Sequence, residues 1–206
     1  VLDKNLLMKF YNRRGFVDFK VLSYKRELLP DYSGYNINIV LNEGNPFVIN
    51  DVLFQNELSN ANKKDLLNLV FLKKGDVLDE RAIEESKKNL NNFFEKDGYT
   101  FVKIKHEIIN KDNKESKLDL KISISEAMKS FVRRINIVGN TRTLDKVLRR
   151  ELLILEGDPF NGQKLKDSLN ALKRLGYFKS VDVNILKTET PGIVDIDLKV
   201  KENLTG

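Results

Sequence analysis

The chain has 206 residues, of which 41% are hydrophobic and 32% charged, and its mean hydropathy is −0.39. This length suffices for one large domain or for two to three small ones, and no apolar stretch approaches the roughly 20 residues of a membrane-spanning helix. The absence of cysteine excludes disulfides, thiol catalysis and cysteine–metal sites. The first ten residues lack the apolar segment and cleavage site of a signal peptide, which also fits the mature part of an exported protein.

The net charge of +6 is unevenly distributed. Residues 1–43 hold 7 basic and 5 acidic side chains, residues 44–127 hold 14 and 15, and residues 128–206 hold 15 and 10. Six of the ten arginines lie in the last of these segments, and the planar fork of arginine suits carboxylate and phosphate partners. Basic residues alternate with acidic ones, and aromatic residues do not gather on one strand face, so we expect no nucleic-acid binding.

The first segment, residues 1–43, predicts one helix followed by two strands. The helix covers residues 2–15 and ends at a glycine, and alternating strands follow over residues 16–27 and 35–43. Because the later segments carry further elements before the same kind of glycine, we interpret this segment as a partial module. It corresponds to the second helix and the last two strands of a unit cut from a longer array.

Residues 44–127 predict a complete module with the order β-α-α-β-β. The pattern gives a strand over 46–56, helices over 60–71 and 79–98, and strands over 99–109 and 117–125. Asp79 is a candidate N-cap of the longer helix, and Gly98 stands where a left-handed residue ends a helix.

Residues 128–206 repeat this order in a second complete module. The pattern gives a strand over 131–140, helices over 143–155 and 161–176, and strands over 177–186 and 193–200. Thr143 is a candidate N-cap. The last strand places its apolar residues on one side, which is typical of a half-buried sheet. We therefore predict an α+β fold of tandem modules, each a three-stranded mixed sheet covered on one face by two helices.

Matched residues recur at a spacing of about eighty. The glycines that end the longer helices, Gly15, Gly98 and Gly176, are 83 and 78 residues apart, and each precedes an aromatic residue and a strand. The last strand of each module ends near a glutamate. These are Glu43, Glu126 and Glu202. A fixed period indicates modular architecture, and this one is long enough for each unit to be a small domain.

The repeated unit resembles the polypeptide-transport-associated (POTRA) domain. The last module carries the closest match, in the combination "GNTRT", "VLRREL", "EGDPF" and "LGYF", and it is similar to the barrel-proximal POTRA domain of outer-membrane β-barrel assembly factors. The resemblance implies the periplasmic side of a bacterial outer membrane. It also implies unfolded outer-membrane proteins and accessory lipoproteins as partners, together with a membrane barrel of the same protein beyond this chain.

Catalysis is not expected from the residues present. His106 is the one histidine, and it shares a strand face with apolar residues, so we interpret it as structural. Without cysteine, the usual nucleophile–base arrangements and metal clusters lack parts, and no cofactor is predicted. Asp195 and Asp197 have strand spacing on the polar side of the sheet, which indicates a solvated face.

The strand after each longer helix is the predicted client-binding edge. In the POTRA fold this strand lies at a sheet edge, where unpaired amides and carbonyls allow an extended peptide to add with little dependence on its sequence. The three stretches are residues 16–27, 99–109 and 177–186, and contact residues are predicted on the last two. The predicted contact residues are Tyr99, Phe101, Lys103 and Lys105 in one, and Tyr177, Lys179, Val181 and Val183 in the other. The alternative is that the lysines make these strands plain, charge-protected edges.

A second predicted interface lies on the first helix of the last module. Arg149, Arg150 and Glu156 border the apolar run of residues 152–155, a pattern that suits docking of an accessory protein. Two alternatives stay open. Either the leucines face the core and the charges face water, or the basic module is attracted to an anionic lipid surface.

From these observations we expect a non-enzymatic scaffold and chaperone region of an outer-membrane assembly factor. The expected modules are residues 1–43, partial, and residues 44–127 and 128–206, complete. A related transporter of the two-partner secretion type and a purely structural spacer are the alternatives.

Overall fold

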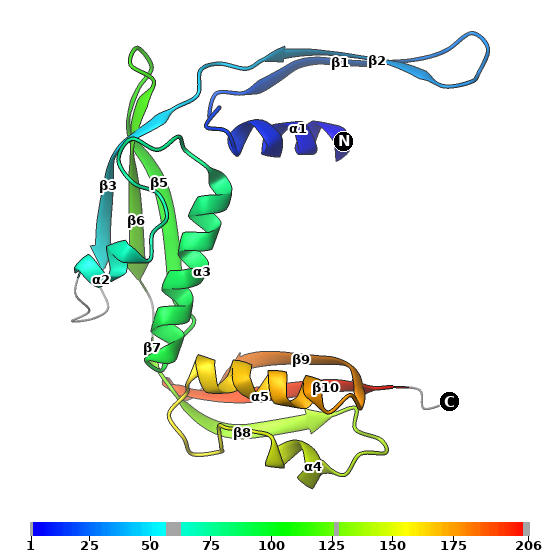
Figure 1. Cartoon of the computed structure of the whole chain (residues 1–206), viewed down its shortest axis with the longest axis vertical. Coiled ribbons are helices and arrows are strands. Elements are labelled where there is room, and N and C mark those ends of the chain that lie inside the picture. The colour runs from blue at the N-terminus through cyan, green and yellow to red at the C-terminus, as the bar shows by residue number, and fades with distance from the viewer. Residues whose placement is uncertain (1, 57–62, 126–127, 204–206) are drawn as a thin grey trace. The chain divides into compact units, whose positions relative to one another are not determined.

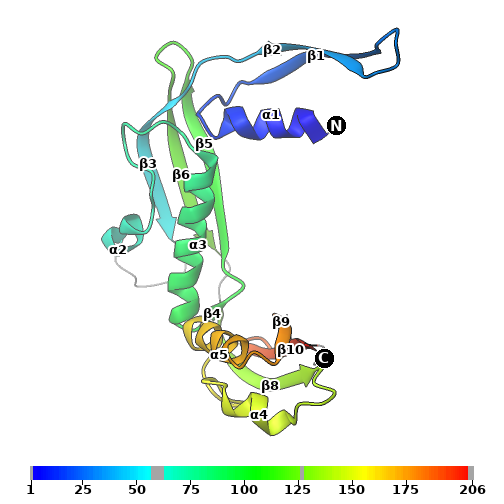
Figure 2. The same cartoon turned by 45° about the vertical axis from the view of Figure 1, so that its right-hand side comes forward.

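A computed structural model describes residues 2–56, 63–125 and 128–203. The chain forms two compact units, Val1–Asn89 with Ile104–Ser123, and Leu90–Lys103 with Ile124–Gly206. Figures 1 and 2 label the elements of each unit. Among the described residues, no helix combines the length and apolar character that crossing a membrane requires.

The first unit begins with a helix and an antiparallel hairpin (Figure 1). Its elements are α1 (Leu2–Asn12), β1 (Lys20–Leu28) and β2 (Tyr35–Asn42). β1 starts later than the predicted residue 16 because the preceding residues turn back on the helix. Gly15 has a φ of +84°, and the buried Phe19 stacks its ring on that of Tyr11 at 4.1 Å.

The sheet of the middle module has the strand order β3-β6-β5. The elements are β3 (Val48–Asn56), α2 (Lys63–Asn68), α3 (Glu80–Lys96), β5 (Lys103–Asp112) and β6 (Lys117–Ser125). Asp79 caps α3 as predicted, since its carboxylate accepts the Arg81 amide at 2.8 Å. Gly98 follows the helix with a φ of +90°, also as predicted. β6 alternates buried and half-buried residues, which gives the module one core face.

The predicted strand over residues 99–109 is interrupted. β4 (Tyr99–Thr100) pairs antiparallel with β7 (Met128–Lys129) in a separate two-stranded sheet, and β5 begins at Lys103. Phe101, between them, has a φ of +56°. This left-handed backbone is uncommon for an aromatic residue, and it lets the chain change pairing partner from β7 to β6.

The second unit contains the complete last module, with the strand order β8-β10-β9 (Figure 2). The elements are β8 (Phe131–Val138), α4 (Asp145–Arg150), α5 (Gly162–Arg174), β9 (Phe178–Lys187) and β10 (Ile193–Glu202). β10 pairs parallel with β8 and antiparallel with β9, so the sheet is mixed. The predicted α+β class, with a three-stranded mixed sheet and two helices in each complete module, is confirmed.

The first helix of this module is shorter than predicted. α4 starts after Leu144 and stops at Arg150, so the prediction of a helix from Thr143 to residue 155 is wrong at both ends. After the helix the chain runs through turns and bends, and burial alternates. Leu152 and Ile154 are buried, whereas Leu153 and Leu155 are 55% and 58% exposed. A continued helix would have placed this apolar run around its circumference.

One core holds the sheet and both helices together. Alternate residues of β10 are buried, and they share a single cluster with Leu148 of α4 and with Leu165 and Leu172 of α5. Since these β10 residues lie on one face of the strand, both helices cover the same face of the sheet. The two edges of that sheet, β8 and β9, are left at its sides.

Candidate functional site

The strands predicted to bind clients are edge strands. β5 is an outer strand of β3-β6-β5, and β9 is an outer strand of β8-β10-β9. On β9, Val181 is buried against the core, whereas Lys179 points outward and is exposed. On β5, Lys103 and Lys105 are both exposed.

Three of the eight predicted contact residues lie outside these edge strands. Tyr99 pairs with Lys129 in the small β4-β7 sheet, and Phe101 occupies the break after it. Tyr177 immediately precedes β9, and its carbonyl accepts the Asn203 amide at 2.9 Å. Tyr99 and Phe101 fall outside because the strand pattern continued past a change of pairing partner that alternation alone does not reveal. Tyr177 falls one residue short of β9 without any change of partner, since Asn203 directly follows β10. Lys103, Lys105, Lys179, Val181 and Val183 do lie on the edges.

The single histidine lies in an apolar setting on β5. His106 lines a small cavity of about 190 Å³ together with Ile83 and Ile108. Burial lowers the pKa of His106, and the nearby Lys87 acts in the same direction. A half-buried imidazole that is kept neutral is typical of a packing role. Within the ranges that the structure describes, no three His, Asp or Glu side chains are placed to hold a metal ion.

The outer edge of β8 is partly paired by the chain itself. The amide of Val132 donates to the carbonyl of Asp158 at 2.9 Å, and the amide of Gly157 donates back to Val132 at 2.7 Å. Phe131 and Pro159 form an antiparallel bridge. The segment of residues 157–160 therefore occupies the first half of this edge as a neighbouring strand would.

Arg149 and Glu156 come together on the second half of that edge. The Glu156 carboxylate accepts the Ile135 amide at 2.9 Å, and the Arg149 guanidinium donates to the Ile135 carbonyl at 3.1 Å. Arg149 also contacts Asp145 at 2.6 Å and lies 3.7 Å from Glu156. Arg150 points elsewhere and pairs with Glu151 at 3.2 Å. Two of the three predicted docking residues thus form one cluster.

A hollow of about 650 Å³ runs along the same edge. Its walls are residues 134–138 of β8 together with Asp145, Arg149, Glu156 and Asp197. The apolar residues beside it divide by alternation, since Leu153 and Leu155 are exposed while Leu152 and Ile154 belong to the core. Leu152 and Ile154 therefore face the core, and the prediction that the exposed residues of this run contact an accessory protein stays a prediction.

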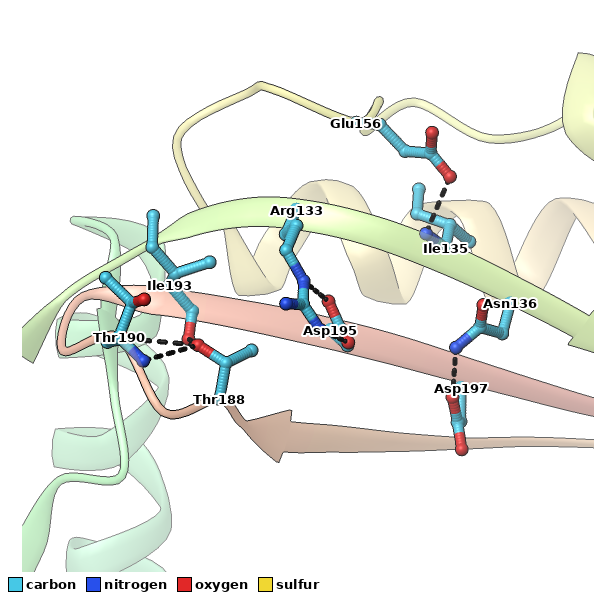
Figure 3. A network of polar contacts seen from close by, with 9 residues as sticks. All are labelled: Arg133, Ile135, Asn136, Glu156, Thr188, Thr190, Ile193, Asp195 and Asp197. Carbon is cyan, nitrogen blue, oxygen red and sulfur yellow. Dashed lines mark hydrogen bonds and ion pairs between the residues drawn. The ribbon is translucent and has the colours of Figure 1, made fainter.

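The acidic residues on β10 pair across to β8 (Figure 3). Arg133 binds both carboxylate oxygens of Asp195, at 2.9 and 2.5 Å, and Asn136 donates to Asp197 at 2.9 Å. The hydrogen bonds from Arg133 lower the pKa of Asp195. The polar face of this sheet is therefore cross-linked rather than simply solvated.

Glu202, at the end of β10, binds the loop that follows β8. Its carboxylate accepts the Thr143 amide at 2.7 Å, the Thr141 hydroxyl at 2.8 Å and the Arg142 amide at 3.1 Å. Hydrogen bonds from the side chain and amide of Thr143, with those from the other two residues, lower the pKa of Glu202 to about 2. The equivalent Glu43 accepts the Tyr11 hydroxyl at 2.5 Å, and Glu126 lies outside the described residues.

Within the second unit, the end of α3 contacts the start of α5. The Asn161 side chain accepts the Lys164 amide at 2.9 Å, which caps α5, and donates to the Lys96 carbonyl at 3.0 Å. A Cβ atom on Gly162 would lie 2.6 Å from the Cβ of Glu95, so glycine is required for this approach. One asparagine therefore serves the ends of two helices from consecutive modules.

Comparison with known proteins identifies the repeated unit. The family model described as "POTRA: Surface antigen variable number repeat" matches residues 47–127 and 130–203. The chain belongs to the POTRA family. The two matched stretches begin just before β3 and β8, so each POTRA repeat includes one complete three-stranded sheet.

Relatives of this POTRA chain include assembly factors of outer membranes. It is 30% identical to "Outer membrane protein assembly factor BamA" of Neorickettsia risticii and 28% identical to that of Neisseria meningitidis serogroup B, each over 99% of the chain. It spans about a quarter of their lengths, 27% and 26%. The crystal structure of Haemophilus influenzae BamA POTRA3-5 superposes with a TM-score of 0.86 over 98% of this chain and 79% of that one, at 22% identity. The chain thus resembles the POTRA region of BamA.

Sequence reasoning about these POTRA modules missed two features. The Ile135 backbone as the partner of Arg149 and Glu156 has no sequence signal, because backbone groups are the same at every residue. The Glu202 contact had a partial signal, since a glutamate ends each repeat, but its partners lie about sixty residues earlier in the chain.

Proposed function

We propose that this chain is the periplasmic POTRA region of an outer-membrane protein assembly factor and that it acts as a non-enzymatic scaffold. It binds unfolded β-barrel clients by strand addition and docks accessory lipoproteins. The observation that carries this proposal is the repeated presence of an outer strand, β5 and β9, at the same position in two POTRA sheets. The assembly-factor relatives supply the setting.

Strand addition suits a scaffold that handles many different clients. An edge strand offers main-chain amides and carbonyls, which any extended polypeptide can pair with, so affinity depends little on the client's side chains. The exposed lysines Lys103, Lys105 and Lys179 disfavour permanent pairing between two copies of the chain. Weak, reversible capture is the result that such edges favour.

The cluster around Arg149 is the proposed docking surface for an accessory lipoprotein. Arg149, Arg150 and Glu156 are exposed beside Leu153 and Leu155, so charged groups border two exposed apolar side chains. An apolar centre with a polar rim is the usual anatomy of a protein interface. Arg150 and Leu153 are free of the β8 edge and are the first residues to substitute.

An NMR titration of the ¹⁵N-labelled chain tests strand addition. The probe is a blocked octapeptide copied from a strand of an outer-membrane barrel. We expect saturable shifts at amides of β5 or β9. The matched control is the same peptide N-methylated at alternate residues, which lacks the donors of one edge and should not bind. Equal shifts with both peptides, or none on β5 and β9, would contradict the proposal.

A purely structural spacer is the second candidate. The contact of the end of α3 with α5 through Asn161 and Gly162 favours it, because these groups serve packing within the second unit. Silence of both edges in the titration, together with no perturbation of residues 149–156 by an accessory lipoprotein, would leave this function.

A further inference from the structure

The outer edge of β8 has a second half that no main chain of residues 2–56, 63–125 or 128–203 covers. Residues 157–160 pair with this edge up to Val132. Beyond a register shift in the β8–β10 ladder, Ile135 turns its amide and carbonyl outward, and side chains rather than a strand meet them. Because backbone groups alternate along a parallel ladder, Ile137 also points its amide and carbonyl outward. Within the described part of the chain we find no hydrogen-bond partner on that side of Ile137.

Arg149 and Glu156 imitate one residue of a neighbouring strand. Glu156 supplies an acceptor to the Ile135 amide at 2.9 Å, where a strand would place a carbonyl, and Arg149 supplies a donor to the Ile135 carbonyl at 3.1 Å, where a strand would place an N–H. Figure 3 shows the Glu156 side chain reaching Ile135 from the loop beside β8. The remaining edge, out to Val138, faces the hollow of about 650 Å³.

We propose that the outer edge of β8 over residues 135–138 is a further binding site for an extended polypeptide segment, and that Arg149 and Glu156 hold it closed. The inference rests on the proposed capture of extended segments, and it assigns that capture to a different strand from β5 and β9. The occupant is identified by the chain's own segment 157–160, which already pairs as an extended strand with the first half of the same edge.

The side chains of Arg149 and Glu156 can leave the Ile135 backbone at low cost. The side chains of Arg149 and Glu156 are 44% and 46% exposed, so water replaces their contacts when they leave Ile135. Arg149 keeps Asp145 as a partner at 2.6 Å in either position. The direct contact between the two charges, at 3.7 Å in an exposed setting, is weak. An incoming segment exchanges two side-chain hydrogen bonds for a longer ladder.

The site also offers places for side chains of the incoming segment. Val138 is 49% exposed at the end of the strand, and Ile137 is half-buried beside it. Alternate side chains of an added strand fall on opposite faces, so one set lies beside Ile137 on the core face and the other lies beside Val138 on the opposite face. The expected ligand is therefore a segment with a β-branched or aromatic residue at every second position.

Opening the edge by mutation tests the proposal on the full 206-residue chain. The probe is a blocked octapeptide of alternating threonine and valine, titrated into ¹⁵N-labelled protein. In the double variant Arg149→Ala with Glu156→Ala, we expect shifts at Ile135 and Ile137 and an affinity roughly 3- to 10-fold higher than in the parent chain, since each displaced hydrogen bond contributes modestly. The matched control, Glu115→Ala with Lys117→Ala, removes an exposed ion pair of the middle module that does not touch β8 and should leave the affinity unchanged.

Two further variants keep the test decisive. Glu156→Gln retains an acceptor for the Ile135 amide and should stay closed, so it separates loss of the hydrogen bond from loss of charge. Ile137→Pro, added to the double variant, removes an outward amide without breaking the β8–β10 ladder and should abolish the shifts. If the β10 amides show that the double variant is unfolded, two single variants replace it. The peptide affinity of Glu156→Gln is then compared with that of Ile137→Pro introduced alone. Unchanged affinity in the double variant, or binding that survives Ile137→Pro, would overturn the proposal.

The outcome separates this site from the proposed function. Shifts confined to β5 or β9 support strand capture and reject the β8 site. Shifts at Ile135 and Ile137 alone support the β8 site and reject β5 and β9. Absence of shifts on all three strands rejects both.

Discussion

The two complete modules share the contacts on the outer edge of their first strand. In the middle module Gly75 donates to the carbonyl of Ile49, and Ile49 donates to Asp76; in the last module Gly157 and Val132 repeat this exchange. Behind each edge a buried serine accepts an amide 15 residues earlier in the chain. The pairs are Ser86 with Phe71 at 2.9 Å and Ser168 with Leu153 at 2.8 Å. The backbone around Gly75 and around Gly157 therefore makes the same hydrogen bonds in the two modules.

The modules differ three residues further along the strand. In the middle module the Val52 amide donates to Asp51, its immediate neighbour, at 2.8 Å, whereas in the last module the Ile135 amide donates to Glu156, 21 residues away. Lys74 stands before the shared glycine where the last module has Glu156. A neighbouring carboxylate moves with its strand, but a distant one can leave it. The same skeleton therefore supports an edge covered from within and an edge that can be opened.

The largest expected effect is the loss of stability on replacing Gly139, which belongs to the last module, and it is compared with the loss at the glycines that occur in both modules, Gly75 and Gly157. Gly139 has a φ of +95°, and a Cβ atom there would lie 1.9 Å from the Val200 carbonyl oxygen. Since this is backbone of the central strand, Gly139→Ala should cost the last module about 3 kcal/mol or more. Native-state hydrogen exchange at β10 and β6 amides measures each module separately.

The corner glycines provide the control for this change. Gly75 and Gly157 have φ values of +95° and +92°, with open space where a Cβ would stand. Alanine at either position should cost about 1 kcal/mol in its own module, from the left-handed backbone alone. A cost for Gly139→Ala no greater than that for Gly157→Ala would contradict the steric argument.

The serines give the next largest effect and the closest match between modules. Ser86 and Ser168 are about 1% and 0% exposed, and each accepts one amide while donating to the carbonyl four residues before it in the helix. Replacement by alanine leaves that amide without its partner, which should cost about 1–3 kcal/mol. Urea unfolding followed by NMR should show nearly equal losses, each in its own module. A loss in only one module would show that the corner is not equivalent in the two.

Much of this comparison was accessible from the sequence, because it depends on periodicity. The glycines at 15, 98 and 176, the longer helices before them and the alternating strands after them predicted the repeats, and the α+β class is confirmed. The interrupted strand at Phe101 was not predicted, since its cause is pairing with β7, which lies 28 residues later in the chain. Likewise, Leu152 and Leu155 suit a helix by composition, and the irregular path of residues 151–158 is decided by tertiary contacts such as that of Leu153 with Ser168.

The candidate site was predicted less completely than the fold. The residue types at Arg149 and Glu156 indicated an interface, but their contact with Ile135 is a property of the folded edge. The roles of the edge lysines and valines as client contacts stay predictions. Charge and alternation locate an edge strand, and neither specifies which edge a partner prefers.

Acid titration compares the stability of the two complete modules through Glu202, at the end of β10. The pKa of Glu202 is lowered from 4.5 to about 2 by its hydrogen bonds to residues 141–143. A carboxyl whose folded pKa is depressed stabilises the fold above its unfolded pKa, and this stabilisation is lost as the pH falls from 4.5 toward 2. Glu202→Gln should flatten that part of the stability profile of the last module and leave the middle module unchanged. Urea midpoints at pH 5, 4 and 3 measure it, and an unaltered slope in the variant would exclude Glu202 as a source.

The smallest effect addresses the difference between the two edges directly. Glu156→Ala should raise the exchange rate of the Ile135 amide roughly 3- to 10-fold, because one exposed hydrogen bond is lost, and Lys74→Ala should leave the Val52 amide unchanged. Asp51→Ala should speed exchange at Val52 by a similar factor, since its carboxylate is the partner there. The decisive comparison uses a partner protein instead of a mutation. A protein that binds the Glu156 carboxylate would speed hydrogen exchange of the Ile135 amide in the parent chain. A protein that binds Lys74 would not speed exchange of the Val52 amide, because that amide is bonded to Asp51. If the partner changed the exchange rates of the Ile135 and Val52 amides equally, the Glu156 carboxylate would not make the edge of the last module easier to open than that of the middle module.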